Sequence, residues 1–335
     1  MADSTNNSQS STPQGVSSGT PSTSPKKKIA ASAALVGNAC ILVAQIFWGV
    51  NVSATKALIP EWMTPDSITV VRLVGGCVLF WLTSLFIKCD KIDRSDFLKI
   101  FLGGFVGLFG FIFLFITSLK YGSPIDISII MTLPPVFVIL IGVIFLHRRP
   151  GWLEYVGVVV SFIGAAVVII YSGGAKSGSN NVLGDLLAVA STICYAFYLV
   201  ILEKPTSKYK PVALLRWVFL CAAVPALFLI PGMVHIPLFH TTHWVPWLEI
   251  GFILLCPTFM AYFLVQPAIK RIGSELVSIY QYLLPVFATI SAVWMGLDHL
   301  RWMQVVAMII IIGGMLMTTF GKRKRVKAMG GKLDD

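Results

Sequence analysis

The sequence predicts an all-α membrane protein with ten transmembrane helices in two inverted five-helix repeats. Three observations lead to this prediction. The composition is 56% hydrophobic and only 12% charged, apolar stretches recur along the chain, and sequence motifs repeat at a fixed offset. Soluble domains carry roughly 25% charged residues, whereas a bilayer accepts apolar surface because lipid removes the need for a polar exterior.

The chain opens with a polar segment, residues 1–29, that is rich in Ser, Thr, Asn, Gly and Pro. It has too few large apolar residues to offset the entropy lost on ordering, so we predict a disordered tail. A cleavable signal peptide is not expected, because the first apolar run begins too late and lacks a small-residue cleavage pattern.

The predicted spans are delimited by charged or Pro/Gly-rich breaks, and each has roughly the 20 apolar residues that cross the hydrocarbon core as a helix. In the first repeat, residues 34–171, the spans are 34–58, 67–87, 97–119, 125–146 and 152–171. In the second repeat, residues 182–320, they are 182–203, 211–231, 246–269, 274–296 and 301–320. Residues 321–335 form a basic tail.

Basic residues are distributed unevenly between the two predicted membrane faces. Nineteen Lys and Arg residues lie in the two tails and in the loops after the second, fourth, sixth and eighth spans, whereas three or four lie on the opposite face. Lys and Arg concentrate on the cytoplasmic side, so we predict that both termini are cytoplasmic, in an inner or plasma membrane. The net charge of +11 then faces anionic membrane lipid, and no nucleic-acid partner is needed to explain it.

The two halves share motifs at an offset of 150 residues. LPPVF at 133–137 matches LLPVF at 283–287, and Trp152 matches Trp302. Arg72 in the second span has a counterpart in Arg216 in the seventh. Each half has an odd number of spans, so the second half enters the membrane from the opposite side. Inverted repeats of this kind are common in secondary transporters, which bind substrate near the midplane.

Characteristic runs occur in the same order in both halves. QIFWGVNVSATKALI in the first span is followed by an arginine in the second span and by LKYGSP before LPPVF; YAFYLVILEK, Arg216, IKRIGSE and LLPVF follow in the second half. This order resembles the EamA domain of the drug/metabolite transporter superfamily over residues 34–320. The resemblance implies that spans 1–4 and 6–9 surround a central cavity, with spans 5 and 10 outside. It also implies diverse substrates, including amino acids, other metabolites, drugs and nucleotide sugars.

Polar and aromatic side chains within the spans are candidates for a substrate cavity, because polar groups in lipid are costly unless they face a cavity or a partner. The candidate substrate-binding residues are Trp48, Asn51, Arg72, Thr132, Tyr195, Tyr198, Arg216, Tyr262, Gln266, Tyr280, Gln281 and Tyr282. Such a lining suits an amphipathic small molecule. Hydrogen bonding between helices and anchoring at the membrane interface are the alternative roles.

The two arginines have two interpretations. Either could attract an anionic group of a substrate, such as a carboxylate. We favour a structural tie at a helix end, because both lie within reach of a membrane interface. The carboxylates in the spans all lie near span ends, where helix N-terminal dipoles suit them, so a proton relay receives little support from the sequence.

Prolines occur within two matching spans, at Pro134, Pro135 and Pro285. Proline removes a backbone hydrogen bond and kinks a helix. We predict that these residues act as hinges; a static helix shape is the alternative.

No catalytic residue, cofactor or metal site is expected. The sequence has no CxxC or HExxH motif, and the loop that holds His235, His240 and His243 offers no cysteine or carboxylate to complete a metal site. Gly164, Gly313 and Gly314 predict close helix packing within the chain or between chains, which leaves a homo-oligomer open.

These features favour a secondary transporter that moves a small organic metabolite by alternating access, with an amino acid or related compound as substrate and efflux as the direction. One alternative is an organic-anion or nucleotide-sugar exchanger of the same superfamily, which would need a basic cavity. Another is a membrane receptor or scaffold without flux. An enzyme is not expected, because neither paired intramembrane carboxylates nor a nucleophile with a credible base is present.

Overall fold

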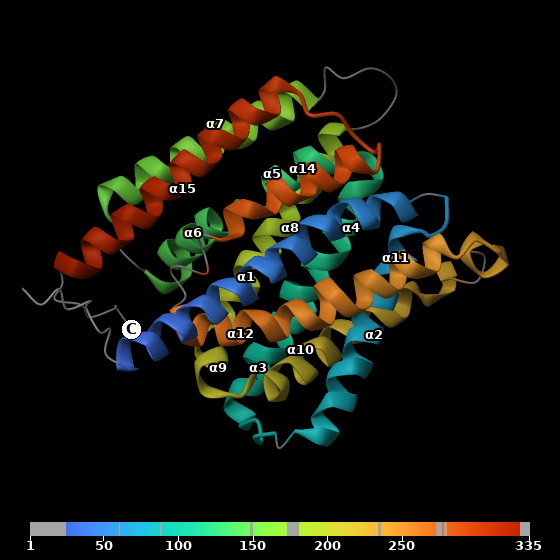
Figure 1. Ribbon diagram of the computed structural model, residues 1–335, viewed down its shortest axis with the longest axis horizontal. Coiled ribbons are helices and arrows are strands. Elements are labelled where there is room, and N and C mark those ends of the chain that lie inside the picture. Colours follow the sequence, from blue (N-terminus) through green and yellow to red (C-terminus); the bar gives the residue numbers. More distant parts are fainter. Residues whose placement is uncertain are drawn as a thin grey trace, which may run out of the picture.

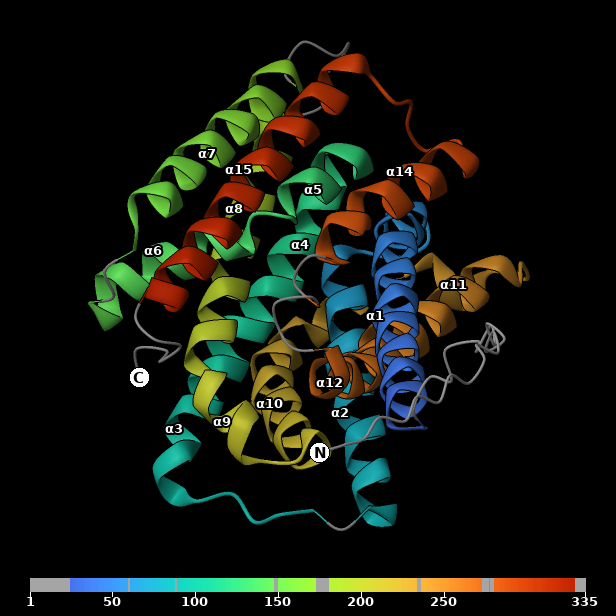
Figure 2. The same cartoon turned by 60° about the vertical axis from the view of Figure 1, so that its left-hand side comes forward.

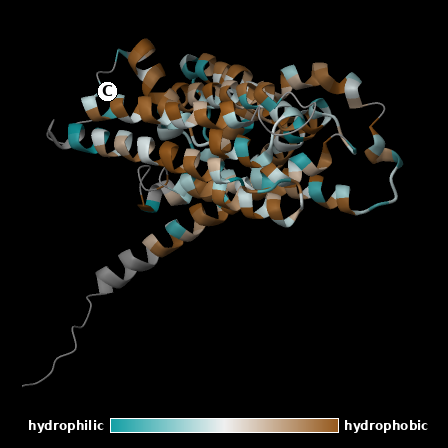
Figure 3. Cartoon of the chain, turned by 90° about the horizontal axis from the view of Figure 1, so that it is seen from above, coloured by the Kyte–Doolittle hydropathy of each residue, from teal (hydrophilic) through white to brown (hydrophobic). Residues whose placement is uncertain are grey.

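The structure is a computed structural model that describes residues 25–328, except residues 60, 88, 148–149, 173–180, 234–235, 273–276 and 278–279. In this part of the chain every regular element is a helix (Figure 1). Hydrophobic residues dominate the helices (Figure 3). Large apolar side chains such as Phe86, Trp294 and Phe228 are 87%, 85% and 83% exposed, as expected of surfaces that face lipid.

The helices of each half follow one another with short connections. Those of the first half are α1 (Pro25–Leu58), α2 (Pro65–Phe86), α3 (Arg94–Leu102), η1 (Gly103–Phe109), α4 (Gly110–Tyr121), α5 (Pro124–Ile130), α6 (Pro134–Leu146) and α7 (Trp152–Ser172). Those of the second half are α8 (Asn181–Ile201), α9 (Glu203–Lys208), α10 (Pro211–Ala226), η2 (Leu227–Met233), η3 (Pro237–His240), α11 (Val245–Ile253), η4 (Leu254–Met260), α12 (Ala261–Ile272), η5 (Gln281–Leu283), α14 (Leu284–Trp294) and α15 (Trp302–Ala328).

Nine helical stretches among the described residues are long and apolar enough to cross a membrane. They coincide closely with nine of the ten predicted spans, and the chain is therefore a multi-pass membrane protein. The remaining predicted span, 274–296, corresponds to a shorter apolar helical segment, Gln281–Trp294, which follows residues outside the described part. The total of ten spans therefore stays a prediction.

The ends of the chain differ from the predicted tails. Helix α1 begins at Pro25, so residues 25–29, which the sequence assigns to the disordered tail, belong to a helix; residues 1–24 lie outside the described part. Helix α15 continues to Ala328, well into the predicted basic tail of residues 321–335. A helix can continue past the membrane edge because Lys and Arg are good helix formers in water.

The prolines of the fourth span break the helix rather than kink it. Helix α5 ends at Ile130, a short turn follows, and α6 begins with Pro134 and Pro135 in its first turn. Two consecutive prolines cannot continue a helix, since each lacks an N–H and clashes with the carbonyl four residues earlier, but their fixed φ suits a first turn. Pro285 has the same position in the first turn of α14. The expectation of a kinked continuous helix is therefore wrong for the fourth span, whereas in the ninth span the 3₁₀ turn η5 runs directly into α14 without a break.

The third and eighth spans each contain a π-helical segment of seven residues, η1 and η4, which begin at Gly103 and Leu254. In η4 the segment coincides with Pro257, which has no N–H to donate to the carbonyl of Ile253. Wider π-helical turns redirect neighbouring side chains and often occur at functional sites. Thr258 of η4 contacts Arg72, which lines the central cavity described below.

Helices α7 and α15 form an antiparallel pair at one side of the bundle (Figures 1 and 2). Small residues allow their backbones to approach: a Cβ atom at Gly164 would lie 2.5 Å from Cγ1 of Ile311, and one at Gly314 would lie 2.6 Å from the carbonyl oxygen of Gly157. The predicted close packing of Gly164 and Gly314 thus occurs within the chain. Gly313 has no atom within 4 Å of such a Cβ position, so it does not contribute to this contact.

The remaining helices form a central bundle in which the two halves interlock. Helix α1 packs against α12 and α14 of the second half, and α8 packs against α4, η1 and α6 of the first half. Helix α2 packs against α10, where the rings of Phe80 and Phe219 lie 4.9 Å apart. Helices of both halves therefore contribute side chains to one shared core.

Candidate functional site

A cavity lies at the centre of this bundle, between the two halves. It is lined by Gln45, Trp48, Asn51, Val52, Arg72, Phe111, Phe115, Met131, Pro134, Tyr195, Tyr262, Gln281 and Leu284. The space between these side chains is partly open to the outside, and the cavity volume is about 70 Å³. In this conformation the cavity is smaller than the roughly 300–1,000 Å³ of typical ligand pockets, so its side chains must move apart to admit a metabolite.

Arg72 is the only charged residue among the described residues that line the cavity. It is 5% exposed, and its Nε donates a hydrogen bond to Oγ1 of Thr258 at 3.1 Å. Its Nη1 is buried and has no hydrogen-bond partner among the described residues. An arginine at this depth requires a partner or water, and the hydrogen bond to Thr258, within the described part of the chain, is to a neutral side chain.

Thr258 is oriented by the backbone of the π-helical segment. Its hydroxyl donates to the carbonyl oxygen of Ile253 at 2.8 Å, the group to which Pro257 has no N–H to offer. With its proton directed there, Oγ1 of Thr258 presents its lone pairs to Arg72. The indole Nε1 of Trp48 donates to the carbonyl oxygen of Pro257 at 3.1 Å. One short stretch of η4 therefore holds two cavity side chains.

Gln45 and Asn51 are the polar residues that α1 contributes. Gln45 is completely buried, and neither its Nε2 nor its Oε1 has a hydrogen-bond partner among the described residues. Asn51 is 4% exposed, and its Oδ1 accepts a long hydrogen bond of 3.4 Å from Thr55. Because an unpaired buried amide costs free energy, Gln45 is a group that a ligand can satisfy.

Aromatic rings form much of the remaining wall. The rings of Trp48 and Tyr262 meet edge to face with centroids 6.1 Å apart. Phe111 and Tyr195 lie 4.7 Å apart, and Tyr195 stacks on Tyr198 at 5.8 Å. These rings offer flat apolar surfaces to a ligand.

Seven of the residues singled out in the sequence line this cavity, and the others do not. Those in the lining are Trp48, Asn51, Arg72, Pro134, Tyr195, Tyr262 and Gln281. Those outside the lining are Thr132, Pro135, Tyr198, Arg216, Tyr280, Tyr282 and Pro285. The side chain of Gln266 lies outside the described part of the structure, as does His235.

The residues outside the lining have other contacts. Thr132 donates its hydroxyl to the carbonyl oxygen of Ile129 at 2.7 Å, in the break between α5 and α6. The guanidinium of Arg216 lies over the rings of Trp81 and Trp217, 5.2 Å and 5.9 Å from their centroids. The two arginines that match in sequence therefore have different surroundings.

The sequence analysis missed six lining residues: Gln45, Val52, Phe111, Phe115, Met131 and Leu284. Gln45 had a usable signal, because it lies three residues before Trp48 and six before Asn51, on the same face of one helix. The apolar five had none, since lipid-facing and cavity-facing Phe, Val, Leu and Met look alike in a sequence. They lie on the cavity only because of how the helices pack.

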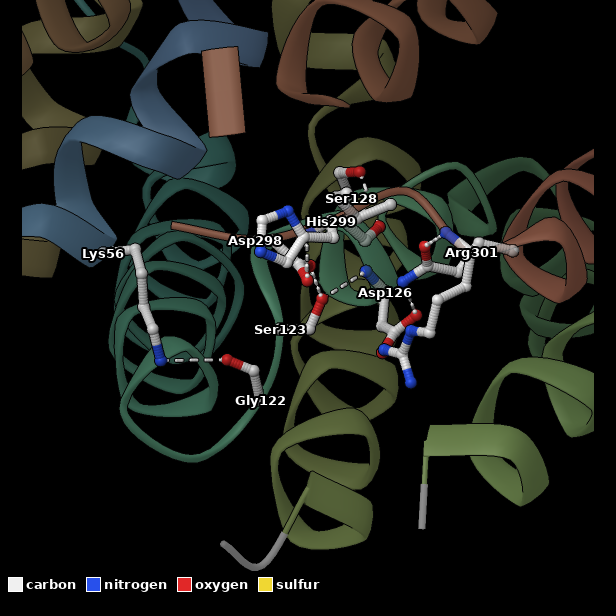
Figure 4. Close-up of polar contacts among 10 residues, drawn as sticks. Lys56, Gly122, Ser123, Asp126, Ser128, Asp298, His299 and Arg301 are labelled. Atoms are coloured by element: carbon white, nitrogen blue, oxygen red, sulfur yellow. Dashed lines mark hydrogen bonds and ion pairs between the residues drawn. The ribbon is translucent and has the colours of Figure 1, made fainter. Parts of the chain in front are cut away.

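A polar cluster lies at the end of the bundle where α1 ends and α15 begins. This far-end cluster consists of Lys56, Ser123, Asp126, Asp298, Arg301 and Gln304 (Figure 4). Asp126, 2% exposed, accepts from Nη2 of Arg301 at 3.1 Å and from Nε2 of Gln304 at 2.8 Å. Ser123 donates to Asp298. These contacts join the start of α5 in the first half to the connection between α14 and α15 and to the first turn of α15 in the second half.

Lys56 completes the far-end cluster from α1. Its Nζ donates to the carbonyl oxygens of Leu119 at 2.6 Å and Gly122 at 3.0 Å, at the end of α4. These are carbonyls near a helix C-terminus, where a cation is favoured. The ammonium therefore ties the end of α1 to the end of the third span.

The other end of the bundle has ion pairs between connections. Nζ of Lys208 lies 2.6 Å from Asp93 and 2.7 Å from Asp96, and the hydroxyl of Tyr209 donates to Asp96 at 2.8 Å. The hydrogen bonds to Asp93 and then Asp96 raise the pKa of the Lys208 ammonium. The pairs join the connection before α3 to that before α10, again across the two halves.

No group of three or more His, Cys, Asp or Glu side chains within the described residues is arranged to hold a metal ion. All six cysteines are free thiols.

Comparisons with known proteins agree with this architecture. A model of the EamA-like transporter family matches twice, at residues 35–170 and 182–320. A solved crystal structure superimposes with a TM-score of 0.55 over 87% of this chain and 98% of that chain, at 22% sequence identity. That likeness supports the fold.

Two relatives illustrate the range of the family. An uncharacterized transporter of Archaeoglobus fulgidus is 25% identical over 56% of this chain, and the match spans 65% of that protein, just under two thirds of its length. The aromatic amino acid exporter YddG of Ancylobacter novellus is 24% identical over 66% of this chain and 76% of that protein. Because the family model matches both halves and so most of the sequence, the chain belongs to the EamA-like transporter family.

Proposed function

We propose that this transporter moves a small organic metabolite through the central cavity by alternating access between two inverted five-helix repeats. The observation that carries the proposal is the cavity itself, which lies between the halves, is partly open to the outside and takes its lining from both. A site between two repeats is alternately exposed when one repeat rocks against the other. The relative named as an aromatic amino acid exporter makes amino acids and related compounds the first class to test, and efflux the first direction.

Inverted symmetry is supported by features that recur in matching places. The π-helical segments η1 and η4 begin 151 residues apart, and the proline-initiated helices α6 and α14 begin 150 residues apart. The packing of α1 on α12 matches that of α8 on η1 and α4. With ten spans, both termini face the same side, and the distribution of Lys and Arg places that side in the cytoplasm.

The exchanger alternative has weaker support. An exchanger for nucleotide sugars or other multiply charged anions needs a basic cavity, but Arg216 lies against Trp81 and Trp217 instead. Arg72 then remains as the one cation in the described lining. A single cation suits a ligand with one negative group better than a diphosphate.

Counterflow in proteoliposomes tests the proposal. Purified protein is reconstituted, and labelled amino acids, monocarboxylates, nucleosides and sugar phosphates are screened against empty liposomes. We expect saturable exchange of one class. Leu284→Trp should abolish it by filling the cavity, whereas Val293→Trp, at a residue that is 47% exposed on the same helix, should retain it. Ligand-induced thermal stabilisation without flux for any class would instead support a receptor.

The proline sites at the start of α6 and α14 are proposed hinges. Pro135→Ala combined with Pro285→Ala returns one backbone N–H to the first turn of each helix and so should stiffen both sites. We expect slower counterflow with little change in ligand affinity. Unchanged turnover would reject a hinge role.

Reporter fusions at both chain ends test the topology. We expect cytoplasmic signals from both, and an external signal from either end would overturn the orientation.

A further inference from the structure

We propose that the cavity binds a small monocarboxylate with a net charge of −1 and an aromatic or apolar body, and that its carboxylate lies between Arg72 and Gln45. This inference rests on the proposed function and names the substrate class of that site. It follows from three features of the cavity: its charge, its unpaired polar groups and the nature of its walls.

The charge of the cavity is positive. Arg72 is almost fully buried, and no Asp or Glu is among the described lining residues. The hydrogen bond from Arg72 to Thr258 satisfies one N–H of the guanidinium but brings no negative charge. A buried cation without a counter-charge is costly. A ligand with net charge −1 neutralises it, whereas a zwitterion adds no net charge and brings an ammonium for which the lining offers no acid.

The unpaired groups match a carboxylate. Nη1 of Arg72 and Nε2 of Gln45 are both buried, both belong to residues that line the cavity and both lack a partner among the described residues. They are donors of hydrogen bonds, and a carboxylate accepts at two oxygens with about four lone-pair positions. Because Nε of Arg72 is already held by Thr258, the guanidinium is fixed in direction before a ligand arrives. Charge-assisted hydrogen bonds of this kind are roughly twice as strong as neutral ones.

The walls match an apolar or aromatic body. Trp48, Tyr262, Phe111 and Tyr195 border the cavity, and the indole N–H of Trp48 is already used by the carbonyl of Pro257. A polyhydroxylated ligand would find few free partners on these rings, and its hydroxyl groups would lose their water. A ring or short alkyl chain loses little and gains dispersion contacts.

Five small probes separate the charge requirement from the shape requirement. Purified protein is titrated at pH 7 with 3-phenylpropanoate, with its neutral amide and with L-phenylalanine, and the same is done for hexanoate and hexanamide. We expect at least one acid to bind about tenfold or more tightly than its own amide, because the acid makes charge-assisted hydrogen bonds that the neutral amide cannot make. We also expect 3-phenylpropanoate to bind more tightly than phenylalanine.

Variants tie that preference to the two residues. Arg72→Gln should remove the preference of acid over amide, while Arg216→Gln, the same change at the arginine outside the cavity, should retain it. Gln45→Leu provides a second test that does not threaten folding, because it removes a buried unpaired amide. It should weaken acid binding and leave the melting temperature unchanged or higher.

The outcomes distinguish this inference from the proposed function. Equal affinity of acids and amides, or tighter binding of phenylalanine than of 3-phenylpropanoate, would overturn the monocarboxylate assignment. An acid preference that survives both Arg72→Gln and Gln45→Leu would overturn its location. If either occurs while counterflow of another compound is saturable, the transport proposal stands and this inference fails. Acid binding without counterflow of any compound would reject transport alone.

Discussion

Replacement of Thr258 by valine is the sharpest test of how the cavity is built. Valine has nearly the same shape but no hydroxyl, so the change removes two hydrogen bonds: that from Nε of Arg72, at 3.1 Å, and that to the carbonyl oxygen of Ile253, at 2.8 Å. The first involves a charged group and is worth about 1.5–3 kcal/mol, and the second about 1 kcal/mol. Both sites are buried, so water does not readily replace the lost partner.

The expected loss appears in two measurements. The melting temperature should fall, because Arg72 and Ile253 lose partners that the unfolded chain replaces with water. Binding of a carboxylate probe should weaken about tenfold or more, because the guanidinium is no longer held in one direction before the ligand binds.

Thr318→Val is the matched control. Thr318 is 3% exposed, and its hydroxyl donates to the carbonyl oxygen of Met315 at 2.7 Å, but it lies in α15, away from the cavity lining. We expect it to reduce stability slightly and to leave probe binding unchanged. If Thr258→Val and Thr318→Val have the same effect on binding, Thr258 does not position Arg72.

Two further predictions concern the periphery of the cavity. Gly164→Leu should destabilise the protein by separating α7 from α15, since a Cβ atom at Gly164 would lie 2.5 Å from Ile311. Gly313→Leu is the control and should be tolerated, because a Cβ atom at Gly313 has no other atom within 4 Å. Equal melting temperatures of the two variants would contradict this packing argument. Asp126→Asn should loosen the far-end cluster, because Arg301 loses its buried counter-charge. A cysteine introduced at Met131, in a background without the native cysteines, should then react faster with a membrane-impermeant thiol reagent added on that side, and an unchanged rate would show that the cluster does not close the cavity.

Sequence patterns were sufficient for nine of the ten predicted spans, because hydropathy is a strong signal over about 20 residues. They were insufficient at the helix breaks. The run Met131–Leu133 contains no Gly, Asn or Asp that would indicate a turn, so the prolines that follow it suggested a kink. Whether a proline kinks or ends a helix depends on whether neighbouring groups satisfy the carbonyls it leaves free, and that depends on the tertiary structure.

The candidate site was partly predictable for a related reason. Polar residues within apolar spans stand out, so Trp48, Asn51 and Arg72 were found, although a structural tie near an interface was favoured for Arg72. The structure places that arginine at the cavity instead, because α2 packs between α10 and η4. The functional roles of these residues stay predictions that the experiments above test.

The contrast between Arg72 and Arg216 indicates that the two halves share a backbone plan but not a binding chemistry. The π-helical segments match with an offset of 151 residues, so Thr258 of η4 corresponds to Gly107 of η1. Gly107 has no hydroxyl to offer, and it packs so closely on α8 that a Cβ there would lie 2.8 Å from Cβ of Tyr198.

The position that corresponds to Thr258 therefore offers Arg216 no hydroxyl, and its guanidinium lies over Trp81 and Trp217. A symmetric cavity would hold two cations and favour a doubly charged ligand. Among the described lining residues the cavity has one cation, which agrees with the proposal of one carboxylate for each substrate molecule. Trp81→Leu would remove one aromatic partner of Arg216; we expect this variant to bind dicarboxylate probes more tightly than the unaltered chain, and unchanged dicarboxylate affinity would show that the asymmetry does not set the charge of the ligand.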